Sequence, residues 1–269
     1  MCCKSLAYMV QYKFEGGFFM FSRPNSETAC GMFTLPHIIS LIICLIIVGL
    51  AIYFSRKLNE NKIKLITKIM AYVFTIWEIA KIIFKFIIDD AKYLDHWVPL
   101  YFCSLFIVAL WLCAYGKGRV YKLGESFIIG GCIVGGFAFL VVPATSLMDY
   151  PVYHFLSIHS MVYHSSMLYI GILYIWRKKF KLDLSAFINY SVFVGFFGVL
   201  SIILNLILDQ NFMILTRPVN IPIEFLNVIA KNVPWLYTVG ALMLYIAIPF
   251  YFVKGILFII EKLWKIKHR

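Results

Sequence analysis

The chain alternates between long apolar stretches and short polar connections. Each stretch reaches or nearly reaches the roughly 20 residues that a helix needs to cross a bilayer. We therefore expect an all-α fold, a polytopic membrane bundle of about seven transmembrane helices. The stretches cover residues 34–54, 64–88, 97–115, 125–145, 153–176, 187–208 and 235–262.

Lysine and arginine gather in every second connection. Basic residues mark the cytoplasmic loops of membrane proteins, so these connections are expected inside the cell. An odd number of spans then places the N-terminus outside and the C-terminus in the cytoplasm. The chain divides into an extracytoplasmic or interfacial tail at 1–33, a single transmembrane domain at 34–262 and a basic cytoplasmic tail at 263–269.

The composition supports a membrane protein and excludes a soluble domain. Of the 269 residues, 62% are hydrophobic and 14% are charged, a balance suited to lipid. The formal net charge of +12 does not indicate a nucleic-acid partner, because the basic residues lie in short clusters between apolar stretches. The expected location is the cell membrane, as a multi-pass protein, and the sequence leaves any protein partner unknown.

Polar side chains inside the apolar stretches gather near one end of the predicted bundle. Ionisable groups in hydrocarbon cost about 3 kcal/mol each on insertion scales, so several at one depth indicate a shared internal site. At 1.5 Å rise per residue they fall within about 15 Å of the outer boundary, so the site is expected to open toward the outer leaflet. The set comprises Glu78, Lys81, Cys103, His159, His164 and Asn205, with His37 close by.

The second stretch carries four charged residues on one helical stripe. Glu78, Lys81, Lys85 and Asp89 are spaced three, four and four residues apart, which places them on a single face. Pairing of Glu78 with Lys81 would offset much of the cost of burying either charge. Two roles stay open for this pair: it orients the second helix, or it holds a ligand or takes part in catalysis.

Histidines repeat every five residues in the fifth stretch, at 154, 159 and 164. Successive members point about 140° apart on a helix, so they do not converge on one metal ion. No metal or other cofactor is expected. One of His159 and His164 is expected to face the interior, with a purely structural role as the other interpretation. A histidine within hydrogen-bond reach of Cys103 would remove its proton and produce a nucleophilic thiolate.

VPLYFCSL at 98–105 is similar to the LPLHLC-type motif of the YwaF-like family of bacterial integral membrane proteins, with Tyr101 in place of the usual histidine. LNLILDQNFMILTRP at 204–218 is similar to its N-x-x-x-G-T-N-Y-M-x-L block, with Asp209-Gln210 in place of Gly-Thr. The likeness runs in order along nearly the whole chain. Further agreement comes from Pro36-His37, Trp77-Glu78 with Lys81, His164 and Pro234-Trp235.

The YwaF-like family is in turn similar to the eukaryotic transmembrane protein 164 group, which includes a cysteine-dependent acyltransferase of ether phospholipids. The resemblance implies a phospholipid acyltransferase that forms a thioester on Cys103, with His164 as its base. In such a mechanism, His159 is an alternative proton carrier. Membrane phospholipids are the implied partners, and Asn205 and Asn211 would line the site or order a loop. The expected substrate-binding positions are Glu78, Lys81, His37, Tyr101, Asn205 and Asn211.

Two other functions stay open from the sequence. In the first, the protein is a non-enzymatic small-molecule carrier or ligand-binding membrane protein, in which Glu78, Lys81 and the histidines form a polar cavity. The sequence contains no visible inverted repeat, which weakens the carrier interpretation. In the second, the protein is a structural subunit in which neither the cysteine nor the histidines matter.

Overall fold

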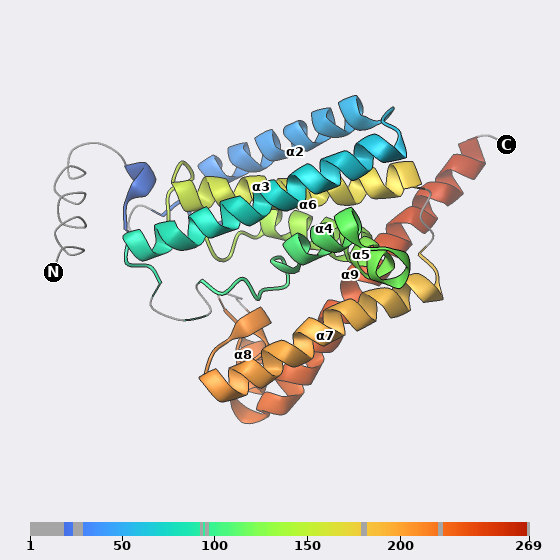
Figure 1. Ribbon diagram of the computed structural model, residues 1–269. Coiled ribbons are helices and arrows are strands. Elements are labelled where there is room, and N and C mark those ends of the chain that lie inside the picture. Colours follow the sequence, from blue (N-terminus) through green and yellow to red (C-terminus); the bar gives the residue numbers. More distant parts are fainter. Residues whose placement is uncertain are drawn as a thin grey trace.

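The computed structural model describes residues 19–23, 29–91, 94, 97–178, 182–219 and 223–267. Within these residues the fold is all helical and has no β-strand, as the sequence predicts (Figure 1). The elements in chain order are η1 (Phe19–Phe21), α2 (Leu35–Ser55), α3 (Glu60–Ile87), α4 (Leu105–Tyr115), α5 (Gly118–Val141), α6 (Phe155–Lys178), α7 (Leu184–Leu208), η3 (Phe212–Ile214), α8 (Glu224–Asn232) and α9 (Pro234–Lys267).

Helix α5 forms the centre of the bundle, because α4, α6, α7 and α9 all pack against it. Helices α2 and α3 lie against α6 on one side, and α7 and α9 lie together on the other (Figure 1). The C-terminal ends of α2 and α6 and the N-terminal ends of α3 and α7 lie at the same end of the molecule, on the right in Figure 1. The connections that follow α2 and α6 therefore lie on the same side of the helical bundle.

Glycines allow α5 to approach its neighbours closely. A Cβ added to Gly136 would lie 2.6 Å from the carbonyl oxygen of His164 on α6. A Cβ added to Gly124 would lie 2.7 Å from the carbonyl oxygen of Ala109 on α4. Small residues at helix interfaces are typical of membrane bundles, because close van der Waals packing holds helices together in lipid.

Polar residues fix where several helices begin. The side chain of Asn59 accepts a hydrogen bond from the backbone N–H of Lys62 at 3.0 Å, at the start of α3. Asp183 accepts one from the N–H of Ala186 at 2.9 Å, at the start of α7. Such N-cap bonds satisfy backbone donors that the first turn of a helix leaves free.

Among the residues that the structure describes, four helical segments are long and apolar enough to cross a membrane by length and composition. Helices α3 and α6 have the length, at 28 and 24 residues, but they carry the polar residues that lower their hydropathy. Helix α4 has only 11 residues. The four segments are Leu35–Ser55, Gly118–Val141, Leu184–Leu208 and Pro234–Leu263.

The sequence predicts a third spanning helix at 97–115, but the chain is helical only from Leu105 onward. The prediction is therefore wrong for the first part of this span. Pro99 offers no N–H and disfavours the helical conformation at the preceding residue. The carbonyl of Leu100 instead accepts a hydrogen bond from the N–H of Met213 at 3.1 Å. Irregular backbone at membrane depth is tolerated where the protein itself satisfies it.

Large apolar side chains cover the outer surface of the bundle. On α2, Ile42, Ile46 and Leu50 are more than half exposed, and in the apolar window of α9 only 17% of the residues are buried. Extended apolar surfaces of this kind suit contact with hydrocarbon rather than with water.

Candidate functional site

Cys103 lies in the turn that leads into α4. The hydroxyl of Tyr163, on α6, donates a hydrogen bond to the Cys103 carbonyl at 3.2 Å. The thiol faces Gly135 of α5, since a Cβ added to that glycine would lie 3.6 Å from Sγ and 3.3 Å from Cε of Met167. The glycine therefore leaves room for the cysteine side chain between α5 and α6.

Glu78 is the centre of a buried polar cluster between α3 and α6. Its Oε1 forms an ion pair with Nζ of Lys81, which confirms the pairing expected from their spacing. Its Oε2 lies 3.7 Å from Nε2 of His159. Both Glu78 and His159 are at most 5% exposed. His159 is thus the histidine that faces this acid.

The charged stripe of α3 continues toward the helix end, but with a different last member. Nζ of Lys85 lies 3.3 Å from Oδ2 of Asp90, and the same oxygen accepts a hydrogen bond from the hydroxyl of Tyr150 at 2.8 Å. Asp89, which the spacing had placed on the stripe, is exposed and adopts φ +64°. The helix ends at Ile87, so the left-handed residue turns the chain and Asp90 takes the expected position.

Aromatic rings connect the Glu78 cluster to the cysteine. The His159 ring stacks against Tyr163, with centroids 5.9 Å apart and an interplanar angle of 16°. Trp77 contacts the His159 ring edge to face at 5.7 Å. Nε1 of Trp77 and Nε2 of His159 are buried without a hydrogen-bond partner among the described residues. Most buried polar atoms are bonded, so two unbonded atoms in one place are unusual.

His164 lies on the side of α6 that faces α5. Its ring stacks flat on Phe139, with centroids 3.7 Å apart and an angle of 8°. Its Nδ1 lies 2.7 Å from the carbonyl oxygen of Ser160. A carbonyl only accepts, so Nδ1 carries the hydrogen and the neutral ring keeps a lone pair on Nε2. Across the described residues, no hydrogen bond joins the Cys103 thiol to His159 or His164.

His37 has a different environment. Its Nδ1 accepts a hydrogen bond from the N–H of Phe33 at 2.9 Å, and its Nε2 donates to the carbonyl of Leu140 at 3.0 Å. Both ring nitrogens are therefore used to tie the start of α2 to the end of α5. The contacts of His37 are with this corner of the bundle and not with Glu78.

Asn205 and Asn211 hold the loop that follows α7. The side chain of Asn205 accepts from the N–H of Phe212 at 2.7 Å and donates to its carbonyl at 3.1 Å. The side chain of Asn211 accepts from the N–H groups of Thr216 and Arg217 and donates to the Arg217 carbonyl. Both side chains therefore bond to the backbone of this loop and help to order it.

The loop ordered by the two asparagines supports the cysteine turn. Met213 is fully buried, and its N–H donates to the carbonyl of Leu100, three residues before Cys103. Met213 and Ile214 both adopt positive φ, at 54° and 55°. Positive φ is a genuine outlier for a β-branched residue, and such backbone persists only where surrounding contacts impose it. Tyr101 lies in the same turn, where its carbonyl accepts from the N–H of Ser104 at 3.0 Å.

Sequence reasoning missed Tyr163 and Asp90. Tyr163 lies four residues after His159, so helical spacing already places the two on one face of α6. No comparable signal identified Asp90, because its position depends on the left-handed turn at Asp89.

Comparison with known families identifies the family of this chain. A family model, that of the TMEM164 family, matches residues 32–252, which include α3, the cysteine turn, α6 and the loop after α7. No curated protein and no solved structure matches the chain. Since the match covers most of the chain and the helices carry lipid-compatible surfaces, the chain belongs to the TMEM164 family and is an integral membrane protein.

Proposed function

We propose that this membrane protein is a cysteine-dependent phospholipid acyltransferase and that Cys103 is its nucleophile. One observation carries the proposal: the cysteine lies in a non-helical turn inside the bundle, and Tyr163 joins that turn to the buried pair of Glu78 and His159. Ionisable groups inside a membrane bundle are expensive and are typically functional. Residues 98–105 resemble the cysteine motif of the YwaF-like family, which is similar to a group that includes an acyltransferase, and this resemblance supports the same proposal.

The reaction has two balanced steps. A base takes the proton of the Cys103 thiol, and the sulfur attacks the ester carbonyl carbon of a phospholipid; the C–O bond to glycerol breaks, and the base gives the proton to the leaving alkoxide. The hydroxyl of a second lysophospholipid then attacks the thioester, the C–S bond breaks, and the hydroxyl proton returns to the thiolate. No cofactor is needed, because the acyl group moves between two oxygen atoms through sulfur.

His164 is the proposed base for the thiol proton. Its Nδ1 hydrogen bond to Ser160 orients the ring and leaves Nε2 as the acceptor. The thiol and the imidazole must approach each other when lipid binds, as catalytic hydrogen bonds often tighten only in the substrate complex. His159, beside Glu78, is the alternative proton carrier. Lys81 and Arg217 are proposed to hold the phosphate of the head group, which requires that they come together around the lipid.

The adduct itself tests the mechanism. Purified protein incubated with a phospholipid that carries a labelled acyl chain should acquire a hydroxylamine-sensitive label. Cys103→Ala should abolish the label and His164→Ala should slow its formation at least about 100-fold. Cys30→Ala is the matched control, since Cys30 is also a half-buried free cysteine and should leave labelling unchanged. Labelling that persists in Cys103→Ala, or none with any phospholipid, would overturn the proposal.

We further propose seven spans in the cell membrane, with the N-terminus outside, in which the turns at 98–104 together with α4 form the third span. The shared location of the ends of α2 and α6 supports this arrangement. A membrane-impermeant thiol reagent applied to intact cells should add label to Asp209→Cys and none to Lys57→Cys, relative to the native chain. The reverse result would invert the orientation.

A non-enzymatic ligand-binding role is the second candidate. The observation in its favour is that Nε1 of Trp77 and Nε2 of His159 are buried beside Glu78 without hydrogen bonds among the described residues. These two nitrogens are available for hydrogen bonds to a polar ligand. In that case Cys103→Ala would be without effect on ligand binding, while Glu78→Gln would abolish it.

A further inference from the structure

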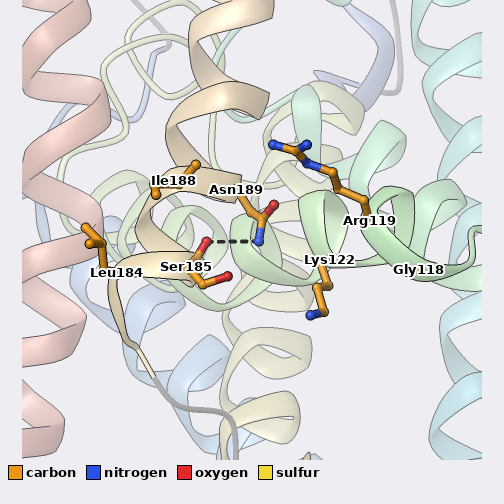
Figure 2. A pocket seen from close by; sticks show the side chains of 7 residues that line it. All are labelled: Gly118, Arg119, Lys122, Leu184, Ser185, Ile188 and Asn189. Atoms are coloured by element: carbon orange, nitrogen blue, oxygen red, sulfur yellow. Dashed lines mark hydrogen bonds between the residues drawn. The ribbon is translucent and has the colours of Figure 1, made fainter.

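A groove of about 610 Å³ lies at the opposite end of α4 from Cys103, between the first turns of α5 and α7. Helix α4 alone separates the two ends by roughly 16 Å at 1.5 Å per residue. Figure 2 shows Arg119 extending from α5 toward α7, and Asn189 lying between the two helices. The groove is thus a separate feature from the proposed catalytic centre.

One wall of the groove is cationic. Arg119 and Lys122 are three residues apart on α5 and therefore share a face. Neither takes part in an ion pair with any residue that the structure describes. The helix also begins at Gly118 without a side-chain cap, so its first N–H groups add positive potential next to Arg119. Two unpaired cations beside an uncapped helix start favour an anion.

The opposite wall, on α7, supplies both polar and apolar groups. Ser185 presents a hydroxyl on the side facing α5 (Figure 2). The Asn189 side chain is 93% buried, and its Nδ2 donates to the Ser185 carbonyl at 2.9 Å, which fixes the amide in the groove. Leu184 and Ile188 are 70% and 46% exposed on the same helix. This wall combines hydrogen-bonding groups with aliphatic surface.

Asp183 is the acidic group nearest in sequence to this wall. Its side chain accepts from the N–H of Ala186 and so caps α7. The cap makes α5, rather than α7, the helix whose start is open to an anion.

From this arrangement we infer that the groove binds the phosphate of an anionic phospholipid whose acyl chains lie along Leu184 and Ile188. Arg119 and Lys122 contact the phosphate oxygens, Ser185 donates to the head group, and the exposed leucine and isoleucine contact the start of the chains. A ligand that carries a phosphate and aliphatic chains matches both walls, whereas a soluble phosphate would use only the cationic one. The site is independent of Cys103.

The test uses full-length protein in detergent micelles and measures the rise of Tm with ligand concentration. Three ligands separate the contributions: dioleoyl phosphatidic acid has phosphate and chains, dioleoylglycerol has the chains alone, and glycerol 3-phosphate has the phosphate alone. We expect a saturable rise with phosphatidic acid only. The double variant Arg119→Gln with Lys122→Gln should weaken apparent affinity about 30-fold, as expected for two lost surface cations.

The matched control is Lys62→Gln with Lys64→Gln, which removes two exposed cations from the first two turns of α3. This variant should bind as the native chain does, and Cys103→Ala should also bind normally, so that failure of this inference is distinguishable from failure of the acyltransferase proposal. Equal weakening by both double variants would overturn the site in favour of general electrostatic attraction. Equal apparent affinity for glycerol 3-phosphate and phosphatidic acid would overturn the lipid assignment.

Discussion

The Glu78 cluster and the loop after α7, which contains Asn211, both have buried polar residues. The hydrogen bonding of these residues differs between the two regions. In the loop, the amides of Asn205 and Asn211 bond to backbone groups of the loop itself. In the cluster, Nε2 of His159 has no hydrogen-bond partner among the described residues and lies 3.7 Å from Glu78. Complete hydrogen bonding indicates a structural role, and incomplete hydrogen bonding indicates a group available to a substrate.

The largest expected effect on stability comes from Glu78→Gln. The change leaves Lys81 without its counter-ion, and loss of one member of a buried pair costs about 3 to 5 kcal/mol. Unfolding of the purified protein in detergent measures this loss.

Adding Lys81→Met to Glu78→Gln provides the control. With both charges removed, most of the lost stability should return. If the double variant is as unstable as the single one, the ion pair is not the reason for the loss.

Asn205→Leu should lower the free energy of unfolding by about 2 kcal/mol, because the buried N–H and carbonyl of Phe212 lose their bonds. The same unfolding measurement applies. Asn227→Ala on the exposed surface of α8 is the comparison, with a change within about 0.5 kcal/mol. Similar losses in the two variants would remove the structural role assigned to Asn205.

His159→Phe should change stability in the opposite direction. The phenyl ring can keep the contacts to Trp77 and Tyr163 while removing an unbonded buried nitrogen, so stability should rise by about 1 kcal/mol. Acyl-adduct formation should fall at least about 10-fold in the same variant. A loss of stability equal to that of Asn205→Leu would erase the distinction between the two regions.

The smallest expected effect is that of Asp209→Gly. Asp209 adopts φ +50° just after α7, where glycine is the least strained residue, so the change should stabilise the protein by about 0.5 to 1 kcal/mol. Asp209→Ala places a residue that disfavours positive φ at the same position, so it should lower Tm. A gain of stability with alanine would show that the left-handed conformation is not the cause.

The sequence predicted the parts of this molecule that depend on helical periodicity. The all-helical class, the Glu78–Lys81 pair and the different directions of His154, His159 and His164 all follow from spacing along a helix. The exceptions depend on contacts between distant residues. Leu100 bonds to Met213 and His37 bonds to Leu140, and no local pattern encodes either contact.

The backbone conformation of Asp209 explains how the chain accommodates one difference from the motif of the resembled family. The resembled family has glycine at this position, and the structure places Asp209 in the left-handed region that glycine occupies without strain. Aspartate is one of the few other residues that tolerate this conformation, so the substitution keeps the turn.

The bond between Leu100 and Met213 also bears on how the protein is made. The turn that contains Cys103 leaves the ribosome more than a hundred residues before the loop that supplies its hydrogen-bond donor. A nascent chain that has not yet produced α7 therefore holds an incomplete cysteine turn beside apolar helices. Synthesis of the chain itself therefore delays completion of the cysteine turn until nearly the whole bundle has been made.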